Sequence, residues 1–227
     1  MTHALTLKID LIMFTAMLIT FTSTVSGVTV GVKVYEWAKY GDFSASWTGQ
    51  KPLGIEEFNS TEWAVVTVQS ISGTTVTVEW LTHYKNGTEK TTTESGDIAT
   101  GSGDISFLII SANLGRGDTI PLNFSGVPDG VSPVINDTVT RTYAGAQREV
   151  NYWGYYFSNV STMYNYTVDY DFYWDKAKGI LCEFTMSMSN ASIGFTISYA
   201  MRMKINETSM WAGGIIPGVP NYMLYII

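Results

Sequence analysis

The chain has 227 residues, a length that suits one all-β domain or two small ones, and 45% of them are hydrophobic while only 15% are charged. The formal net charge is −7, and the lysines and arginines are scattered along the chain rather than clustered. Because a nucleic-acid-binding surface is recognised by a basic patch, we expect no nucleic-acid partner. The abundance of Thr, Val, Tyr and Trp favours strands over helices.

The N-terminus carries an apolar run of eleven residues, Leu11–Phe21, which follows Lys8 and precedes small residues at Val25–Gly27. A run of this length is typical of a secretory signal peptide and is short for a membrane span. We therefore expect residues 1–27 to be a signal peptide, with an uncleaved signal anchor as the alternative. Either role predicts an extracellular or cell-surface location.

The asparagines support export independently. Eight of the eleven lie in Asn-x-Ser/Thr motifs, where the composition would give roughly two by chance, and such motifs mark N-glycosylation in exported proteins. The expected glycosylation sites are Asn59, Asn86, Asn123, Asn136, Asn159, Asn165, Asn190 and Asn206.

Cys182 is the only cysteine, so no disulfide can form within the chain. Glycosylated eukaryotic secreted domains usually contain disulfides, and bacteria seldom use these motifs so densely. The combination favours an archaeal surface protein.

After the leader, the first clear pattern is a three-stranded meander. Residues 63–71 alternate between apolar and polar, Ser72–Thr74 form a turn, and the next strand places Val76, Val78 and Trp80 on one face. Asn86-Gly87 predicts a type I′ hairpin turn into the third strand.

The middle of the chain is less regular. Residues 94–106 repeat Ser-Gly-Asp-Ile and are expected to form a flexible loop, followed by a buried strand or a helical turn before Gly115. Pro128 and Pro133 indicate another loop, and strands resume at Asp137. We expect one antiparallel β-sandwich-like domain over residues 28–212.

A strictly alternating hairpin follows over residues 168–189, with its turn at Asp175–Gly179. The inner face is expected to carry Val168, Tyr170, Phe172, Trp174, Ile180, Cys182, Phe184, Met186 and Met188. The outer face is expected to carry Asp169, Asp171, Tyr173, Asp175, Leu181, Glu183, Thr185, Ser187 and Ser189. Carboxylates that face water make poor general acids, so this acidic, aromatic stretch favours a hairpin over an active site.

Little in the chain indicates catalysis. Once the leader is removed, His83 is the sole histidine, and it cannot assemble a catalytic triad or a histidine-rich metal site. Cys182 lies on the inner face of its strand, where an inert thiol is expected. Asp169 and Asp171 could bind Ca²⁺ weakly, although a solvated strand face explains them better. We expect a non-catalytic protein without metal or cofactor.

The aromatic residues suggest one binding role. Residues 151–157 contain five rings, and displayed rings can stack on sugars, although large rings also fill β cores. Trp80 and Trp174 are expected in the core. Trp153, Tyr155 and Tyr156 are the candidate stacking residues, with Trp153 and Tyr155 on one face and Tyr156 on the other.

Four segments resemble a family of uncharacterised exported archaeal β-rich surface glycoproteins. They are Gly31–Gly41 (GVKVYEWAKYG), Arg141–Tyr152 (RTYAGAQREVNY), Trp174–Leu181 (WDKAKGIL) and Ile205–Trp211 (INETSMW). The resemblance implies a secreted or membrane-tethered β domain and brings no catalytic residues with it. Members of that family often continue into a C-terminal membrane anchor.

The apolar tail, residues 213–227, departs from that pattern because Pro217 and Pro220 leave only Asn221–Ile227 unbroken, which is too short to span a bilayer. The tail could derive from a lost anchor, fold back on its own domain, or be donated as a strand to another subunit. The expected function is structural or adhesive work in the cell envelope, with a strand-donating filament subunit or a carbohydrate-binding module as alternatives. Possible partners are other copies of the chain and envelope glycans or proteins.

Overall fold

The computed structural model describes residues 27–122, 133–160, 164–192 and 195–212. These residues form one antiparallel sheet of ten strands in the order β5-β4-β3-β2-β1-β10-β9-β8-β7-β6, which confirms the all-β prediction. They do not divide into the two separate sheets of a sandwich. The expected leader and apolar tail, together with Asn123 and Pro128, lie outside the described residues.

In the described part of the chain, the strands follow one another with one short helix among them. Their bounds are β1 Trp37–Gly49, α2 Ile55–Ser60, β2 Thr61–Ser72, β3 Thr75–Tyr84, β4 Glu89–Asp97, β5 Ser102–Gly103, β6 Asp137–Tyr143, β7 Ala146–Val160, β8 Tyr164–Asp175, β9 Leu181–Ser192 and β10 Phe195–Thr208. No helix among the described residues is long and apolar enough to cross a membrane.

The predicted meander is confirmed as β2, β3 and β4, and its inner face buries Val66, Val68, Val76 and Val78 completely. The prediction of a type I′ turn at Asn86-Gly87 is wrong. Only Gly87 has a positive φ, 81°, and its N–H donates to the carbonyl oxygen of Tyr84 at 2.8 Å. A three-residue connection with glycine in the left-handed region therefore closes this hairpin.

The Ser-Gly-Asp-Ile repeat is not a loop but pairs with itself. Its first copy ends β4, its second copy begins with β5, and Gly96 lies opposite Gly103. Ile98 and Ile105, the last residues of the two copies, are both buried in the core. A Cβ at Gly96 or Gly103 would collide with the paired copy of the repeat, so the close approach of the two copies requires glycine at both positions.

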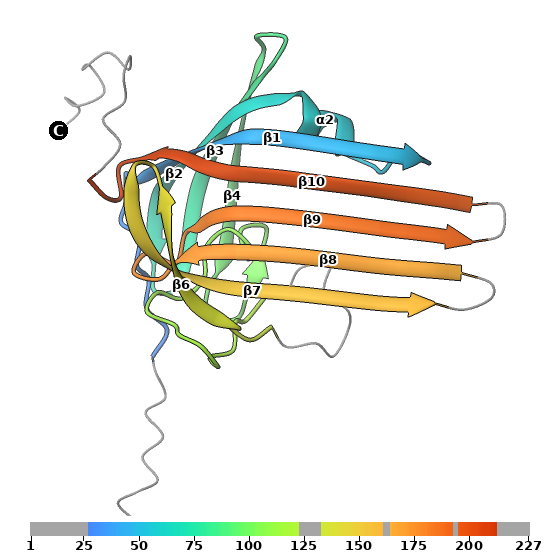
Figure 1. Ribbon diagram of the computed structural model, residues 1–227. Helices are drawn as coiled ribbons and strands as arrows, with labels where there is room; N and C mark the ends of the chain where they lie inside the picture. The colour runs from blue at the N-terminus through green and yellow to red at the C-terminus, as the bar shows by residue number, and fades with distance from the viewer. Residues whose placement is uncertain (1–26, 123–132, 161–163, 193–194, 213–227) are drawn as a thin grey trace, which may run out of the picture.

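The core lies inside the curve of the sheet (Figure 1). Residues 105–114 cross this interior as a buried, irregular segment, joined to the sheet by a bridge between Ile109 and Ile180. This segment was expected to be a strand or a helical turn. It also supplies the carbonyl of Phe107, which accepts a hydrogen bond of 2.8 Å from the indole of Trp174.

Five strands, β1, β10, β9, β8 and β7, extend side by side beyond this core (Figure 1). We call their outer parts, residues 44–49, 154–160, 164–171, 185–192 and 195–202, the arm. Helix α2 packs against β1 at one side of the arm, where Asn59 Oδ1 accepts a hydrogen bond of 3.1 Å from the Ala45 N–H.

The β8–β9 hairpin is confirmed, and its inner face is buried from Val168 to Phe184. Two residues expected on the outer face, Asp175 and Leu181, are nevertheless fully buried. The pairing slips by one residue beyond Tyr173, so strict alternation ends before the turn. Neighbouring segments cover this end of the hairpin, and Arg148 of β7 pairs with Asp175.

Candidate functional site

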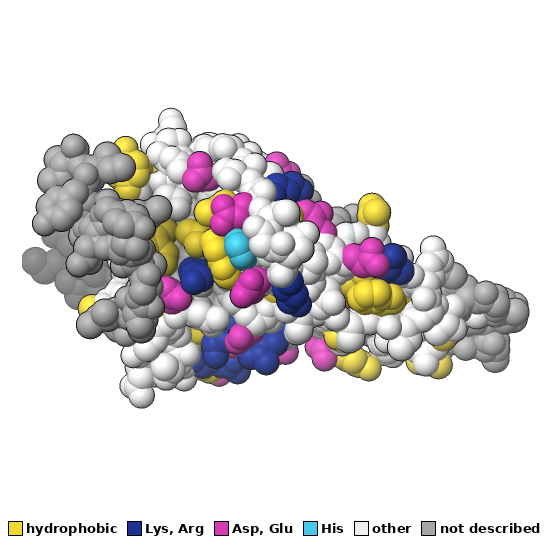
Figure 2. Space-filling view, turned by 90° about the horizontal axis from the view of Figure 1, so that it is seen from above, with side chains coloured by type: hydrophobic (Ala, Val, Ile, Leu, Met, Phe, Trp, Pro, Cys, Tyr) yellow, Lys and Arg dark blue, Asp and Glu magenta, His cyan; other side chains and the backbone are white. Residues whose placement is uncertain are grey.

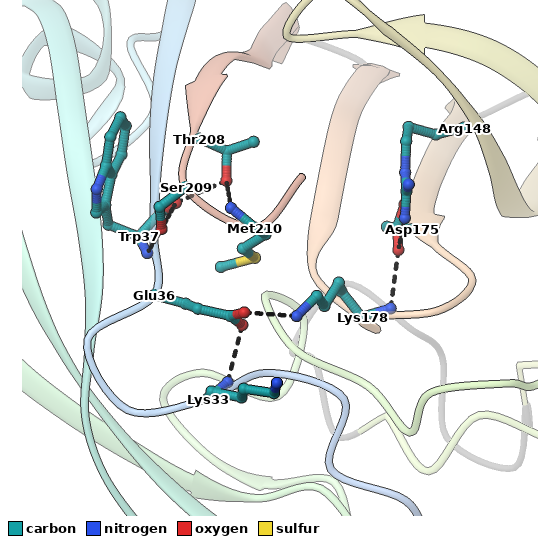
Figure 3. A network of polar contacts seen from close by, with 9 residues as sticks. All are labelled: Lys33, Glu36, Trp37, Arg148, Asp175, Lys178, Thr208, Ser209 and Met210. Carbon is teal, nitrogen blue, oxygen red and sulfur yellow. Dashed lines mark hydrogen bonds and ion pairs between the residues drawn. The ribbon is translucent and has the colours of Figure 1, made fainter. Parts of the chain in front are cut away.

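Two regions stand out: a polar junction at one end of the sheet and the apolar face of the arm at the other. Four segments that are far apart in sequence, residues 31–41, 141–152, 174–181 and 205–211, meet at the polar junction (Figure 3). Each segment binds the next, and the contacts close into a ring.

Two of the links in this ring are ion pairs. Lys178 Nζ lies 2.6 Å from Glu36 Oε1, and both side chains are largely buried. Arg148 Nε lies 2.7 Å from Asp175 Oδ2, and its Nη2 lies 3.2 Å from Oδ1. The hydrogen bond to Asp175 raises the pKa of Arg148. The Lys178 N–H also donates to Asp175 Oδ1 at 2.8 Å, so the buried carboxylate has three donors.

The remaining links tie the end of β10 to its neighbours. Trp211 Nε1 donates to the Tyr143 carbonyl at 3.1 Å, and the guanidinium of Arg148 lies over the Trp211 ring at 4.8 Å. Thr208 Oγ1 donates to the carbonyl oxygen of Trp37 at 2.6 Å. Because the charges of this junction are paired and hydrogen-bonded, the junction is suited to holding chain segments together.

The inner face of the sheet opens into an apolar groove of about 450 Å³ where the core meets the arm. Side chains from opposite parts of the sheet face one another across it, including Phe43, Trp80, Met201 and Met203. Trp80, expected in the core, is instead half-buried in the groove wall and stacks on Tyr40 with ring centroids 5.9 Å apart. A groove with this lining can accommodate apolar groups.

From the groove, the inner face continues along the arm as an apolar row. The strand registers place Trp47, Tyr199, Met188, Val168 and Phe157 side by side across all five strands. The corresponding row on the outer face consists of hydroxyl residues: Thr48, Ser198, Ser189, Thr167 and Ser158. The arm therefore presents two chemically different faces.

The three candidate stacking residues do not share one surface. Trp153 is only 3% exposed and packs on Phe172 with ring centroids 5.4 Å apart. The prediction that this ring is displayed on the surface is therefore wrong. The ring faces the core because β8 places Phe172 directly opposite. Tyr155 is half-buried on the same face. Tyr156 is 68% exposed on the opposite face.

Seven of the eight expected glycosylation sites fall within the described residues. Asn86, Asn136, Asn159, Asn165 and Asn206 are exposed, whereas Asn59 and Asn190 are half-buried. Asn159 and Asn190 flank Tyr166 across neighbouring strands near the tip of the arm, with Asn165 next to Tyr166 on the other face. Glycosylation of these residues stays a prediction.

The other chemical candidates remain separate. His83 stacks on Trp63 and lies 3.0 Å from Glu89 and 3.6 Å from Glu62, on a face where acidic and basic side chains are interspersed (Figure 2). Cys182 is fully buried, and burial raises the pKa of its thiol well above the usual value. No group of three metal-ligating His, Cys, Asp or Glu residues occurs in the part of the chain that the structure describes.

Sequence reasoning missed both regions as units. Alternation placed most apolar residues on the correct face, with Leu181 as an exception, but only strand order shows that β1 and β10 join β9, β8 and β7 in one arm. The four junction segments can be recognised as motifs in the sequence, but only the tertiary structure shows that they contact one another.

Comparison with protein-family models and with curated protein sequences finds no match to this chain.

Proposed function

We propose that this protein is an exported, N-glycosylated and non-catalytic component of the cell envelope, which uses the arm as a contact surface in a structural or adhesive role. In this proposal, residues 1–27 act as signal peptide or anchor, and the curved sheet acts as a sandwich-like domain whose halves face one another.

The observation that carries the proposal is the apolar row across the arm, from Trp47 to Phe157, which runs out from the groove and past the core. Phe157 remains 38% exposed at the end of this row. Apolar surfaces rimmed by polar residues are typical of sites where proteins contact partners.

The test is fractionation of cells of the native host that express either the wild-type protein or a variant of the apolar face. Tyr199→Ser with Met188→Ser is expected to release the protein from the envelope fraction into the medium. Ser187→Ala with Ser189→Ala, on the outer face of β9, is the matched control and should stay in the envelope fraction. An unglycosylated protein in the cytoplasm would contradict the proposal.

A filament subunit is the second candidate, because the edge of β7 could accept a further strand (see below). In the filament expected from the sequence, each subunit would donate Asn221–Ile227 as a strand to a neighbouring subunit. Deletion of Asn221–Ile227 should then abolish multimers, and multimers that persist after the deletion would contradict donation.

Carbohydrate binding is the third candidate and now depends on Tyr156, the one exposed ring of the three. Tyr156→Ala should weaken binding to envelope polysaccharides, and glycan-array binding of the purified protein would measure this. Binding that is unchanged in Tyr156→Ala would exclude stacking on this ring.

A further inference from the structure

Among the described strands, only β6 pairs with the outer edge of β7, and it does so along about half of that edge. Strand β6 pairs with Ala146–Tyr152, and the Gly154 N–H donates to Asn136 Oδ1 at 2.7 Å. Beyond Gly154, none of the strands in the described ranges pairs with this edge. Within the described part of the chain, the edge at residues 155–158 therefore has no neighbouring strand on this side.

The other described edges carry features that discourage strand pairing. The edge of β4 carries Glu89, Lys90 and Glu94, and that of β6 carries Asp137 and Arg141. Charged side chains on edge strands oppose edge-to-edge association. The part of β1 that leaves β2 is covered by α2, as described above.

The open edge of β7 lacks such protection. Residues 153–160 (WGYYFSNV) contain no charge and no proline. Tyr156, Phe157 and Val160 are 68%, 38% and 69% exposed and belong to the few large apolar residues exposed among the described residues. A long, uncharged and apolar edge strand is a site where another strand pairs.

The direction of the free backbone groups follows from one observed bond. Because the Gly154 N–H points away from β8 to Asn136, alternation directs the N–H and C=O groups of Tyr156 and Ser158 to the open side as well. Tyr155 and Phe157 then use their backbone groups in the ladder with β8.

We infer that the open edge of β7 pairs antiparallel with the β7 edge of a second copy of this chain, about a two-fold axis at Phe157. The two sheets join into one. This names a partner for the arm, in keeping with the proposed structural role, but it does not depend on export or glycosylation.

A second copy is the partner that this edge matches best. Pairing at Phe157 sets Phe157 opposite its own counterpart and joins the two apolar rows, and it pairs Tyr156 with Ser158 on the outer face. Aromatic cross-strand pairs stabilise sheets, and no charge is buried. The Tyr156 and Ser158 backbone groups of both copies satisfy one another, and Asn136 does not have to move.

The first test is sedimentation equilibrium of the full-length protein over a range of concentrations. The wild-type protein should dimerise, and Tyr156→Pro should weaken the dimer by at least about tenfold, since each copy loses one outward N–H donor. Tyr156→Ala keeps this N–H and should retain most of the affinity. Unchanged circular dichroism would show that both variants fold, because proline is tolerated where an edge N–H faces outward.

A cross-link tests the register. Residues at the centre of a non-hydrogen-bonded pair have Cα atoms about 4.5 Å apart, within the range of a disulfide. Because Cys182 is fully buried, Phe157→Cys introduces the one accessible thiol among the described residues and should give a covalent dimer under mild oxidation. Met188→Cys, in the same row but two strands inward, is the matched control and should form no covalent dimer, although it should still associate like the wild type.

Several outcomes would overturn the inference: a wild-type protein that is monomeric at all concentrations, Tyr156→Pro that dimerises like the wild type, or Phe157→Cys that cross-links no better than Met188→Cys. Association that is lost only on deletion of Asn221–Ile227 would identify the tail as the occupant instead. None of these results depends on envelope fractionation, so failure here leaves the proposed function to its own test.

Discussion

Asp175, a fully buried carboxylate, is held by Arg148 through two nitrogens, Nε at 2.7 Å and Nη2 at 3.2 Å. This pair joins β7 to the end of β8, next to the turn that leads to β9 (Figure 3). It lies where two of the four motif segments meet, so the stability of the junction depends on it.

Arg148→Ala should destabilise the protein by about 3–5 kcal/mol, because it leaves a buried carboxylate without its cation. Urea denaturation followed by tryptophan fluorescence would measure the change. The control is Lys51→Ala, which removes an ion pair of 2.7 Å between two exposed side chains, Lys51 and Glu56. Lys51→Ala should lower the free energy of unfolding by less than about 1 kcal/mol. Equal effects of the two substitutions would contradict a structural role for the junction.

Trp153→Ala should cost about 3–5 kcal/mol, since the indole is buried against Phe172 and its removal leaves a cavity. Tyr156→Ala, three residues later on the opposite face, should change the free energy of unfolding of the monomer by less than about 0.5 kcal/mol. Thermal unfolding of dilute protein would compare them. A small effect of Trp153→Ala would mean that the ring is displayed after all.

Gly179→Ala should destabilise the protein by more than Gly73→Ala, although both glycines have positive φ angles, 70° and 61°. A Cβ at position 179 would collide with the carbonyl oxygen of Ile110, whereas a Cβ at position 73 would meet open space. Gly73→Ala should therefore cost only the backbone strain of about 1 kcal/mol. The denaturation midpoints of the two variants would measure this difference. A larger loss of stability in Gly73→Ala than in Gly179→Ala would contradict the packing described around Gly179.

The protein should lose stability as the pH rises above about 9. Burial raises the pKa of Tyr40 and of Cys182 well above their usual values of 10.0 and 9.0, so both groups stay protonated in the folded state. Their stabilising contribution is complete below the unfolded pKa and falls as the pH rises through the range up to the folded pKa, because the unfolded state then binds fewer protons.

Cys182→Ala should flatten this decline between pH 9 and 10, because in this range the thiol ionises in the unfolded state but not in the folded state. Denaturation by urea at a series of pH values would test it. Tyr40→Phe should flatten the decline above pH 10 but lower stability at neutral pH, since it removes the 2.7 Å hydrogen bond from Tyr40 Oη to the Leu181 carbonyl. An identical alkaline slope in the wild type and both variants would contradict these assignments.

Local patterns predicted the elements well where alternation was undisturbed, as in β2, β3 and the β8–β9 hairpin. They failed where tertiary contacts compete with alternation. Asp175 was expected in water because its position follows the period of the strand, but the pairing slips before it and Arg148 neutralises it. The prediction of a type I′ turn at Asn86 was wrong for a local reason, because the three-residue connection needs a positive φ only at Gly87.

By itself, the sequence determined the β class and most of the inward-facing residues of the regular strands, because strand periodicity is a property of neighbouring residues. Only the tertiary structure decided how strands remote in the chain are ordered. That order brings the four motif segments into one polar junction and places β1 and β10 beside β9. Among the described strands, it also leaves half of the β7 edge without a neighbour. These features depend on contacts between residues far apart in the sequence, which short-range patterns do not encode.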